Sequence, residues 1–179
     1  MKGAVIVALW IGEDKPDLFS YWIQVLLTLK ERRGFFNKLV LFKDIVLRQT
    51  KTINYSHNAF IYKGLIWHCT TPGGVKCEGL DVGLAGSKIR ARKRIRLDIN
   101  EAVFDKWLKG ELGKEYCITQ NLGHVLGFLK PIVQNGDLKR NCSEFLARAC
   151  YFSGYTFPVN CDYVLPTDTF KVLKPDVYD

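Results

Sequence analysis

The sequence predicts an α+β fold in which an antiparallel β-sheet packs against helices. Three stretches indicate this. Residues 58–67 are mainly apolar, many of them aromatic or β-branched, and Lys63-Gly64 interrupts them, which is typical of a β-hairpin. Basic and aliphatic residues alternate over 88–97, and a period of two indicates a strand. Beyond Cys142, apolar residues recur at the spacing of a helix that buries one face.

Length and composition fit one domain spanning residues 1–179. Hydrophobic residues make up 47% of the chain and charged residues 25%, as in ordinary globular proteins. We expect residues 1–50 to form a strand-and-helix extension and residues 51–155 to form the catalytic core. Six cysteines are too few for a disulfide scaffold and show no Cys-x-x-Cys spacing, so the sequence predicts neither a metal nor a cofactor. A disulfide between Cys69 and Cys77 stays open.

The N-terminal region is expected to begin with a buried strand over residues 3–12. A signal peptide is the alternative, but charged residues follow the apolar run at once and no small-x-small cleavage site is evident. A helix is predicted from Pro16 to about Arg33, and its wide apolar face is expected to pack on the domain. A membrane-surface or partner-binding helix is the alternative. No stretch reaches the roughly 20 apolar residues of a transmembrane helix.

Other elements follow from local signals. Residues 39–47 are predicted to form a strand or strand pair, and 101–109 a helix that Asn100 caps. Residues 122–129 fit another helix, in which we interpret His124 as non-catalytic. The proline-containing tail that follows Val164 is expected to lie across the surface.

Two of the three histidines flank the predicted hairpin. If the hairpin loop holds an even number of residues, His57 and His68 point to the same side of the sheet, with Cβ atoms about 5–8 Å apart. An odd loop would place them on opposite faces. The alternative is two unrelated strand histidines, one exposed and one packed beside Trp67.

Cys142 lies at the predicted start of a helix that Asn141 or Ser143 would cap. The positive end of the helix dipole, together with Lys139 and Arg140, should lower the pKa of its thiol. Free main-chain N–H groups at the same helix end could stabilise an oxyanion. A cysteine, a basic nitrogen and a polar orienting group make up a nucleophilic acyl-transfer site. The alternative is a buried structural cysteine on an amphipathic helix.

The order of these motifs resembles that of circularly permuted papain-like cysteine hydrolases, which include NlpC-type and lecithin:retinol acyltransferase-like proteins. The latter carry a histidine, a second histidine about a dozen residues on, and a later Asn-Cys-Glu motif. Here His57 and His68 are eleven residues apart, and Asn-Cys-Ser-Glu stands at 141–144. Leu-Gly-Lys-Glu-Tyr at 112–116 is similar to the Gly-x-x-Tyr stretch of these domains. The resemblance spans roughly residues 50–155.

The resemblance implies a permuted papain-like fold and a peptide or acyl substrate. Cys142 would be the nucleophile, His57 the general base and His68 its orienter. The resemblance makes peptidoglycan peptide or amide bonds the leading expected substrate. Ser143, directly after the cysteine, is a departure from the lipid acyltransferases and matches bacterial and phage versions better. One alternative is a lipid acyltransferase or thioesterase of the same fold. Another is a non-catalytic module that binds an anionic polymer or a host protein.

The net charge of +8 has a visible source in the alternating strand. Lys88, Arg90, Arg92, Arg94 and Arg96 are expected to share one face, which predicts a platform for a polyanion. A wall polymer, an anionic lipid and a nucleic acid all fit. The alternative is a solvated edge strand that charge keeps from pairing. No motif for specific nucleic-acid recognition is present, and the interleaved side chains are aliphatic rather than base-stacking aromatics.

Overall fold

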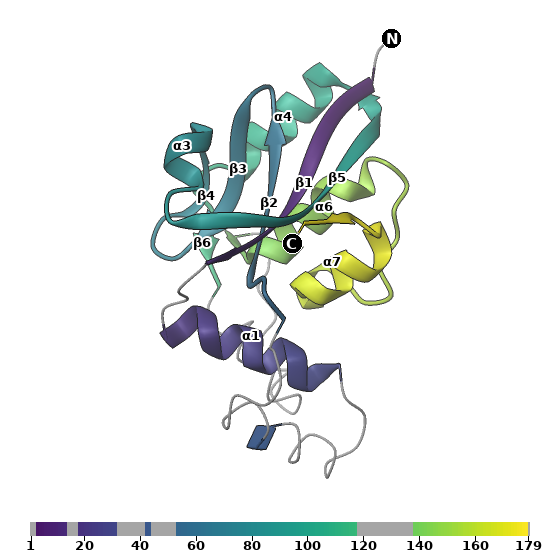
Figure 1. Ribbon diagram of the computed structural model, residues 1–179. Helices are drawn as coiled ribbons and strands as arrows, with labels where there is room; N and C mark the ends of the chain where they lie inside the picture. The colour runs from purple at the N-terminus through teal and green to yellow at the C-terminus, as the bar shows by residue number, and fades with distance from the viewer. Residues whose placement is uncertain (1–2, 14–17, 32–41, 44–52, 118–137, 179) are drawn as a thin grey trace.

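A computed structural model describes residues 3–13, 18–31, 42–43, 53–117 and 138–178 (Figure 1). The main strands are β1 (Gly3–Glu13), β2 (His57–Tyr62), β3 (Leu65–Thr70), β4 (Gly74–Glu78), β5 (Ser87–Asn100) and β8 (Asp176–Val177). They form one antiparallel sheet in the order β4-β3-β2-β1-β5-β8. The short strands β6 (Glu115–Tyr116) and β7 (Lys139–Arg140) pair in parallel. The α+β class with an antiparallel sheet is therefore confirmed.

The helices are α1 (Leu18–Lys30), α3 (Leu80–Gly83), α4 (Glu101–Glu111), α6 (Cys142–Tyr151), the 3-10 helix η3 (Cys161–Tyr163) and α7 (Pro166–Leu173). Two local predictions are confirmed, since α1 lies within its expected range and Asn100 Oδ1 accepts the N–H of Val103 at 2.9 Å. Phe42 and Lys43 are helical rather than extended. The rest of 39–47, the predicted helix at 122–129 and His124 lie outside the described residues. No described helix is long and apolar enough to cross a membrane.

β1 is a central strand of the sheet rather than part of an extension. It pairs with β2 on one side and β5 on the other, so that Val7 lies opposite both Ile61 and Arg94. Leu9 and Trp10 are fully buried. The sequence identified the strand but not its neighbours, because pairing between distant segments leaves no local pattern.

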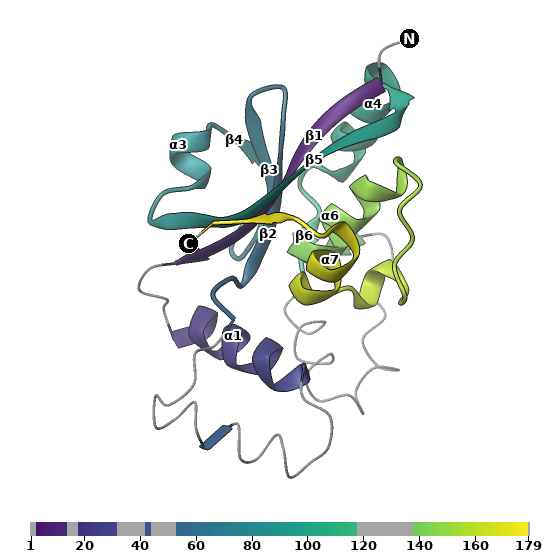
Figure 2. The ribbon, with the colours of Figure 1, turned by 45° about the vertical axis from the view of Figure 1, so that its right-hand side comes forward.

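The two faces of the sheet are covered differently. We call the face against α4 and α6 the helix face; its core includes Trp10, Phe60 and Phe145. The opposite, outer face carries a smaller cluster in which Leu9 and Ile66 are buried, and α3 packs at its β3 end. Figure 2 shows α3 on one side of the sheet and α4, α6 and α7 on the other. Alternate residues of each strand therefore enter different environments.

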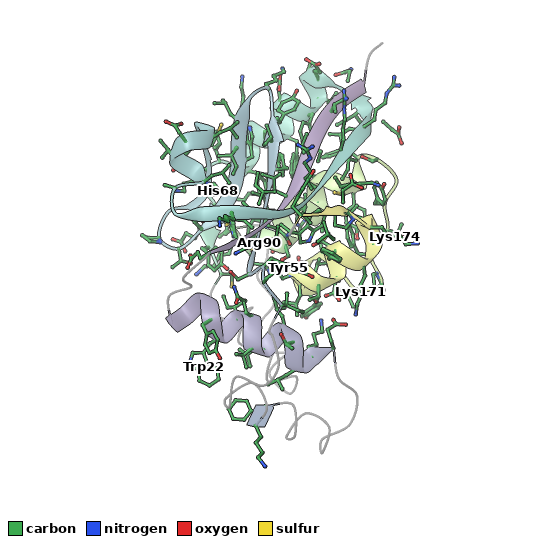
Figure 3. The ribbon with its side chains drawn as sticks, viewed as in Figure 1. Trp22, Tyr55, His68, Arg90, Lys171 and Lys174 are labelled. Carbon is green, nitrogen blue, oxygen red and sulfur yellow. The ribbon has the colours of Figure 1, made fainter. Side chains whose placement is uncertain are left out.

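The C-terminal segment packs into the core through α7. The prediction that it lies across the surface was therefore wrong for this helix. Trp10 Nε1 donates to Thr169 Oγ1 at 3.1 Å, and that hydroxyl donates to Asn58 Oδ1 at 3.0 Å. Tyr55 stacks on Phe170 with ring centroids 5.2 Å apart, beside α7 (Figure 3). Through these contacts α7 packs against the central strands β1 and β2 on the helix face of the sheet.

Two glycines offer a matched test of the hairpin turn. Gly64 has φ of 78° and Gly110 lies in α4 outside the positive-φ region, and a Cβ at either would meet no atom within 4 Å. We expect Gly64→Ala to lower the free energy of unfolding by about 1–2 kcal/mol, because an L-residue is strained at positive φ. Gly110→Ala should raise it by up to about 1 kcal/mol. Denaturant unfolding measures both; an equal effect of the two changes would contradict this account.

Candidate active site

The hairpin brings His57 and His68 together on the outer face. Lys63 and Gly64 form a two-residue turn, both with positive φ, and Ala59 pairs directly with His68. His57 lies two residues before Ala59 and so shares its face. The imidazole centroids are 5.7 Å apart with an interplanar angle of 66°. The predicted even loop and shared side are confirmed.

The two rings differ in their hydrogen bonding. His68 Nε2 lies 3.2 Å from Glu78 Oε2, and the other carboxylate oxygen of Glu78 is 2.6 Å from Lys76 Nζ. His57 Nε2 is buried and has no hydrogen-bond partner among the described residues. His68 is thus anchored, whereas His57 keeps a ring nitrogen available.

Burial keeps both imidazoles neutral near pH 7. It lowers the pKa of His57 to about 4, only partly opposed by the charge of Glu13. It also lowers the pKa of His68 to about 4, helped by repulsion from His57 and opposed by Glu78. A neutral imidazole can accept a proton, which a general base requires.

Cys142 is the first residue of α6, as predicted, and Asn141 is its cap: Asn141 Oδ1 accepts the N–H of Glu144 at 2.7 Å. Weak hydrogen-bonding interactions with the main chain of Asn58 and Ser143, and with the Ser143 hydroxyl 3.8 Å away, partly lower the pKa of the Cys142 thiol. Burial nevertheless raises the pKa of the thiol above its usual value and outweighs these hydrogen bonds. The expected lowering of this pKa was therefore wrong.

The sulfur and the imidazoles lie on different faces of the sheet. α6 packs on the helix face, where Asn58 is buried, whereas His57 and His68 point to the outer face. Within the described part of the chain, no hydrogen bond joins Cys142 Sγ to either ring. His57 and Asn58 are, however, consecutive residues whose side chains point to opposite faces of the sheet. The two halves of the predicted site meet at the end of β2, through the backbone.

A cavity of about 240 Å³ opens at this end of the sheet and takes its lining from both faces. His57 and His68 line it together with Cys69 and Tyr116, two residues that the sequence argument did not select. Tyr116 belongs to the Gly-x-x-Tyr segment, which was the signal available for it. The other lining residues are Ile11, Gly12, Glu13, Ile23, Ser56, Thr70, Thr71, Gly83 and Ser87. Among the described residues, no cluster of three histidine, cysteine or carboxylate side chains is arranged to hold a metal.

Arg140 anchors the start of α6 instead of acting on the thiol. Its side chain is almost fully buried, with Nε 2.7 Å from Glu111 Oε2 and Nη1 3.3 Å from Glu144 Oε1. Glu144 also accepts from Arg148 Nε at 2.8 Å. Because two carboxylates neutralise the guanidinium, its charge is largely unavailable to stabilise a thiolate at Cys142. The sequence showed Arg140 but could not show Glu111, its partner 29 residues upstream.

The basic row of β5 is shorter than the sequence predicted. Trp10 pairs with Ala91 but the next residue, Ile11, pairs with Ile89, so Arg90 is an extra residue in a β-bulge. The bulge breaks the alternation, and Ile89 packs in the outer-face cluster. The remaining members, Arg92, Arg94 and Arg96, are exposed and lie opposite Leu9, Val7 and Val5 on the outer face.

The low pKa values of the histidines predict a pH-dependent stability. The folded protein binds fewer protons than the unfolded chain, whose histidines titrate near 6.5. The contribution of the two neutral histidines to the free energy of unfolding is therefore fully present above about pH 6.5 and is lost as pH falls toward 4. We expect the free energy of unfolding to drop by about 1–3 kcal/mol per histidine over this window. Urea unfolding at several pH values should show the drop, and His57→Gln/His68→Gln should remove most of it. An unchanged pH dependence in that variant would contradict the assignment.

Comparison with protein-family models, with curated proteins and with solved structures finds no significant match to this chain. The resemblance to permuted papain-like hydrolases therefore stays a prediction that rests on the motifs themselves.

Proposed function

We propose that this protein is a thiol-dependent hydrolase that cleaves an amide bond through Cys142, with His57 as general base and His68 as its orienter. The observation that carries the proposal is that the two halves of the predicted site belong to consecutive residues at the end of β2, with the imidazole of His57 on one face of the sheet and Asn58 on the face of Cys142. Cys142 begins α6, where the main chain of Asn58 partly lowers the pKa of its thiol, and the residue bonded to Asn58 is a histidine with an unused, buried nitrogen.

The position of Cys142 at the start of α6 supports a role in acyl transfer. N–H groups at a helix start stabilise a thiolate and can then face the oxyanion that forms on a carbonyl attacked by that thiolate. The neighbouring cavity is lined by both histidines and Tyr116 but not by Cys142, so a substrate bound in it must extend past the end of β2 to present its carbonyl to the sulfur. His57 is neutral near pH 7, but burial lowers its pKa to about 4 and raises the pKa of the thiol, so the proton transfer requires substrate binding to bring the two pKa values closer together.

The reaction would proceed in two balanced halves. His57 Nε2 takes the proton of the Cys142 thiol, the sulfur attacks the carbonyl carbon, and the amine leaves with the proton returned by His57. Water then attacks the thioester and gives a proton to His57, and His57 passes this proton to the departing sulfur, so that the acid is released and the thiol is regenerated. The first step requires the His57 ring to turn around the end of β2 toward the sulfur. His68, fixed by Glu78, would then support the imidazolium.

A second candidate function is a non-catalytic binding module. Two observations favour it: burial raises the pKa of Cys142, and the imidazoles occupy the other face of the sheet. On this alternative Cys142 is a structural cysteine at the start of a buried helix. The same experiment separates the two candidates.

The order in which thiols react with limiting iodoacetamide at neutral pH tests the proposal. Cys77 is half-exposed and Cys142 is buried, so access alone would label Cys77 first. An activated nucleophile reverses this order, and we expect peptide mapping to find Cys142 labelled first. His57→Gln should slow labelling of Cys142 by at least roughly tenfold, because the base is removed, and leave Cys77 unchanged. Faster labelling of Cys77 in the wild-type protein would favour the binding module.

Hydrolysis of peptidoglycan fragments, followed by mass spectrometry, tests the proposed amide substrate. Cys142→Ala and His57→Ala should lose activity to a similar extent, because the two groups act as a unit, whereas His68→Asn should retain more. Cys150→Ala is the matched control, since Cys150 is buried near the other end of the same helix. Turnover of lipid esters instead of fragments would indicate the acyltransferase alternative. Equal activity in Cys142→Ala and Cys150→Ala would exclude Cys142 as nucleophile.

A further inference from the structure

We propose that Arg92, Arg94 and Arg96 form a docking strip for the phosphodiester backbone of a nucleic acid, bound without sequence preference. All three side chains are exposed on the outer face of β5. Within the described residues none of them forms an ion pair, although Arg92 lies over the ring of Tyr178 at 5.1 Å. The inference is independent of the proposed hydrolysis.

The strip has a fixed spacing because the β1–β5 ladder is regular beneath it. Both register shifts between these strands fall outside the pairs formed by the three arginines. Alternate residues of a strand are separated by about 6.6–6.8 Å. Neighbouring phosphates along one strand of a duplex are about 7 Å apart, because the strand winds as it rises about 3.4 Å per nucleotide, so successive phosphates match successive arginines.

The chemistry of the strip suits phosphate. A guanidinium presents a planar fork of N–H donors that binds phosphate oxygens in a bidentate manner, which an ammonium cannot do. All three members that remain after the bulge are arginines. The residues of β1 opposite the three arginines are aliphatic, and Arg92 lies over the ring of Tyr178, which agrees with contact to the backbone rather than to the bases.

The surroundings favour a linear polyanion over a lipid surface. Asp176 on β8 lies directly opposite Arg92, and exposed Asp98 lies two residues beyond Arg96. Asp176 therefore bounds the strip on the β8 side, and Asp98 bounds its end along β5. A flat anionic membrane would bring headgroup phosphates against both carboxylates, whereas a single chain of phosphates can follow the arginines between them.

Fluorescence anisotropy with labelled mixed-sequence DNA, single-stranded and duplex, tests the strip in the full-length protein. Each phosphate contact contributes about 0.7 (single strand) to 0.9 (duplex) to the slope of log K against log salt concentration. Arg94→Gln/Arg96→Gln should therefore lower that slope by about 1.4–1.8 in magnitude, measured between about 50 and 200 mM salt. Arg94→Lys/Arg96→Lys should keep the slope and lose affinity severalfold, because charge is kept and the bidentate geometry is lost.

The matched control is Lys106→Gln/Lys109→Gln, which also reduces the net charge from +8 to +6 but acts on α4, on the helix face. We expect it to change the slope by less than half as much as the arginine pair. Equal slopes for the two Gln variants would overturn the proposal, since net charge alone would then explain binding. Stronger binding to phosphatidylserine vesicles than to DNA, lost in the arginine variants, would also overturn it in favour of a membrane partner.

Discussion

The start of α6 depends on the burial of one guanidinium. Arg140 is enclosed by Glu111 from the end of α4 and by Glu144 from the first turn of α6. A buried charge costs several kcal/mol unless its partners are well placed, so these elements must dock together in one geometry. The main-chain oxygen of Arg140 also accepts the thiol of Cys69 at 3.3 Å and the N–H of Cys117 at 2.9 Å. The position of the candidate nucleophile is therefore set by a polar network as well as by apolar packing.

Much of the local structure could be predicted because it depends on neighbours in the sequence. The two-residue turn at Lys63-Gly64 follows from the tolerance of glycine for positive φ, and it places His57 and His68 on one side of the sheet. Asn141 caps α6 because a short carbonyl side chain satisfies a free N–H group at a helix start. These parts of the fold and of the candidate site carry their information within a few residues.

The parts that could not be predicted depend on contacts between distant segments. Strand periodicity predicted that the two histidines share one face of the sheet. It could not predict that α6, which carries Cys142, packs on the opposite face. The bulge at Arg90 is visible only in the pairing of β5 with β1, and it shortens the basic row. The central place of β1 likewise depends on two partners far along the chain. The same limit applies to the burial of Arg140, whose carboxylate partner Glu111 comes from a different element.

The central place of β1 has a consequence for how the chain reaches its fold. Val7 pairs with Ile61 and Arg94, which lie 54 and 87 residues further along. During synthesis this strongly apolar strand is made before either neighbour, and its hydrogen-bonding edges stay unpaired until both arrive. Pairings over such separations close slowly, and an exposed β-forming segment is prone to associate with other chains meanwhile. Yield on refolding should consequently depend on protein concentration, and on how soon β2 and β5 enclose their shared strand.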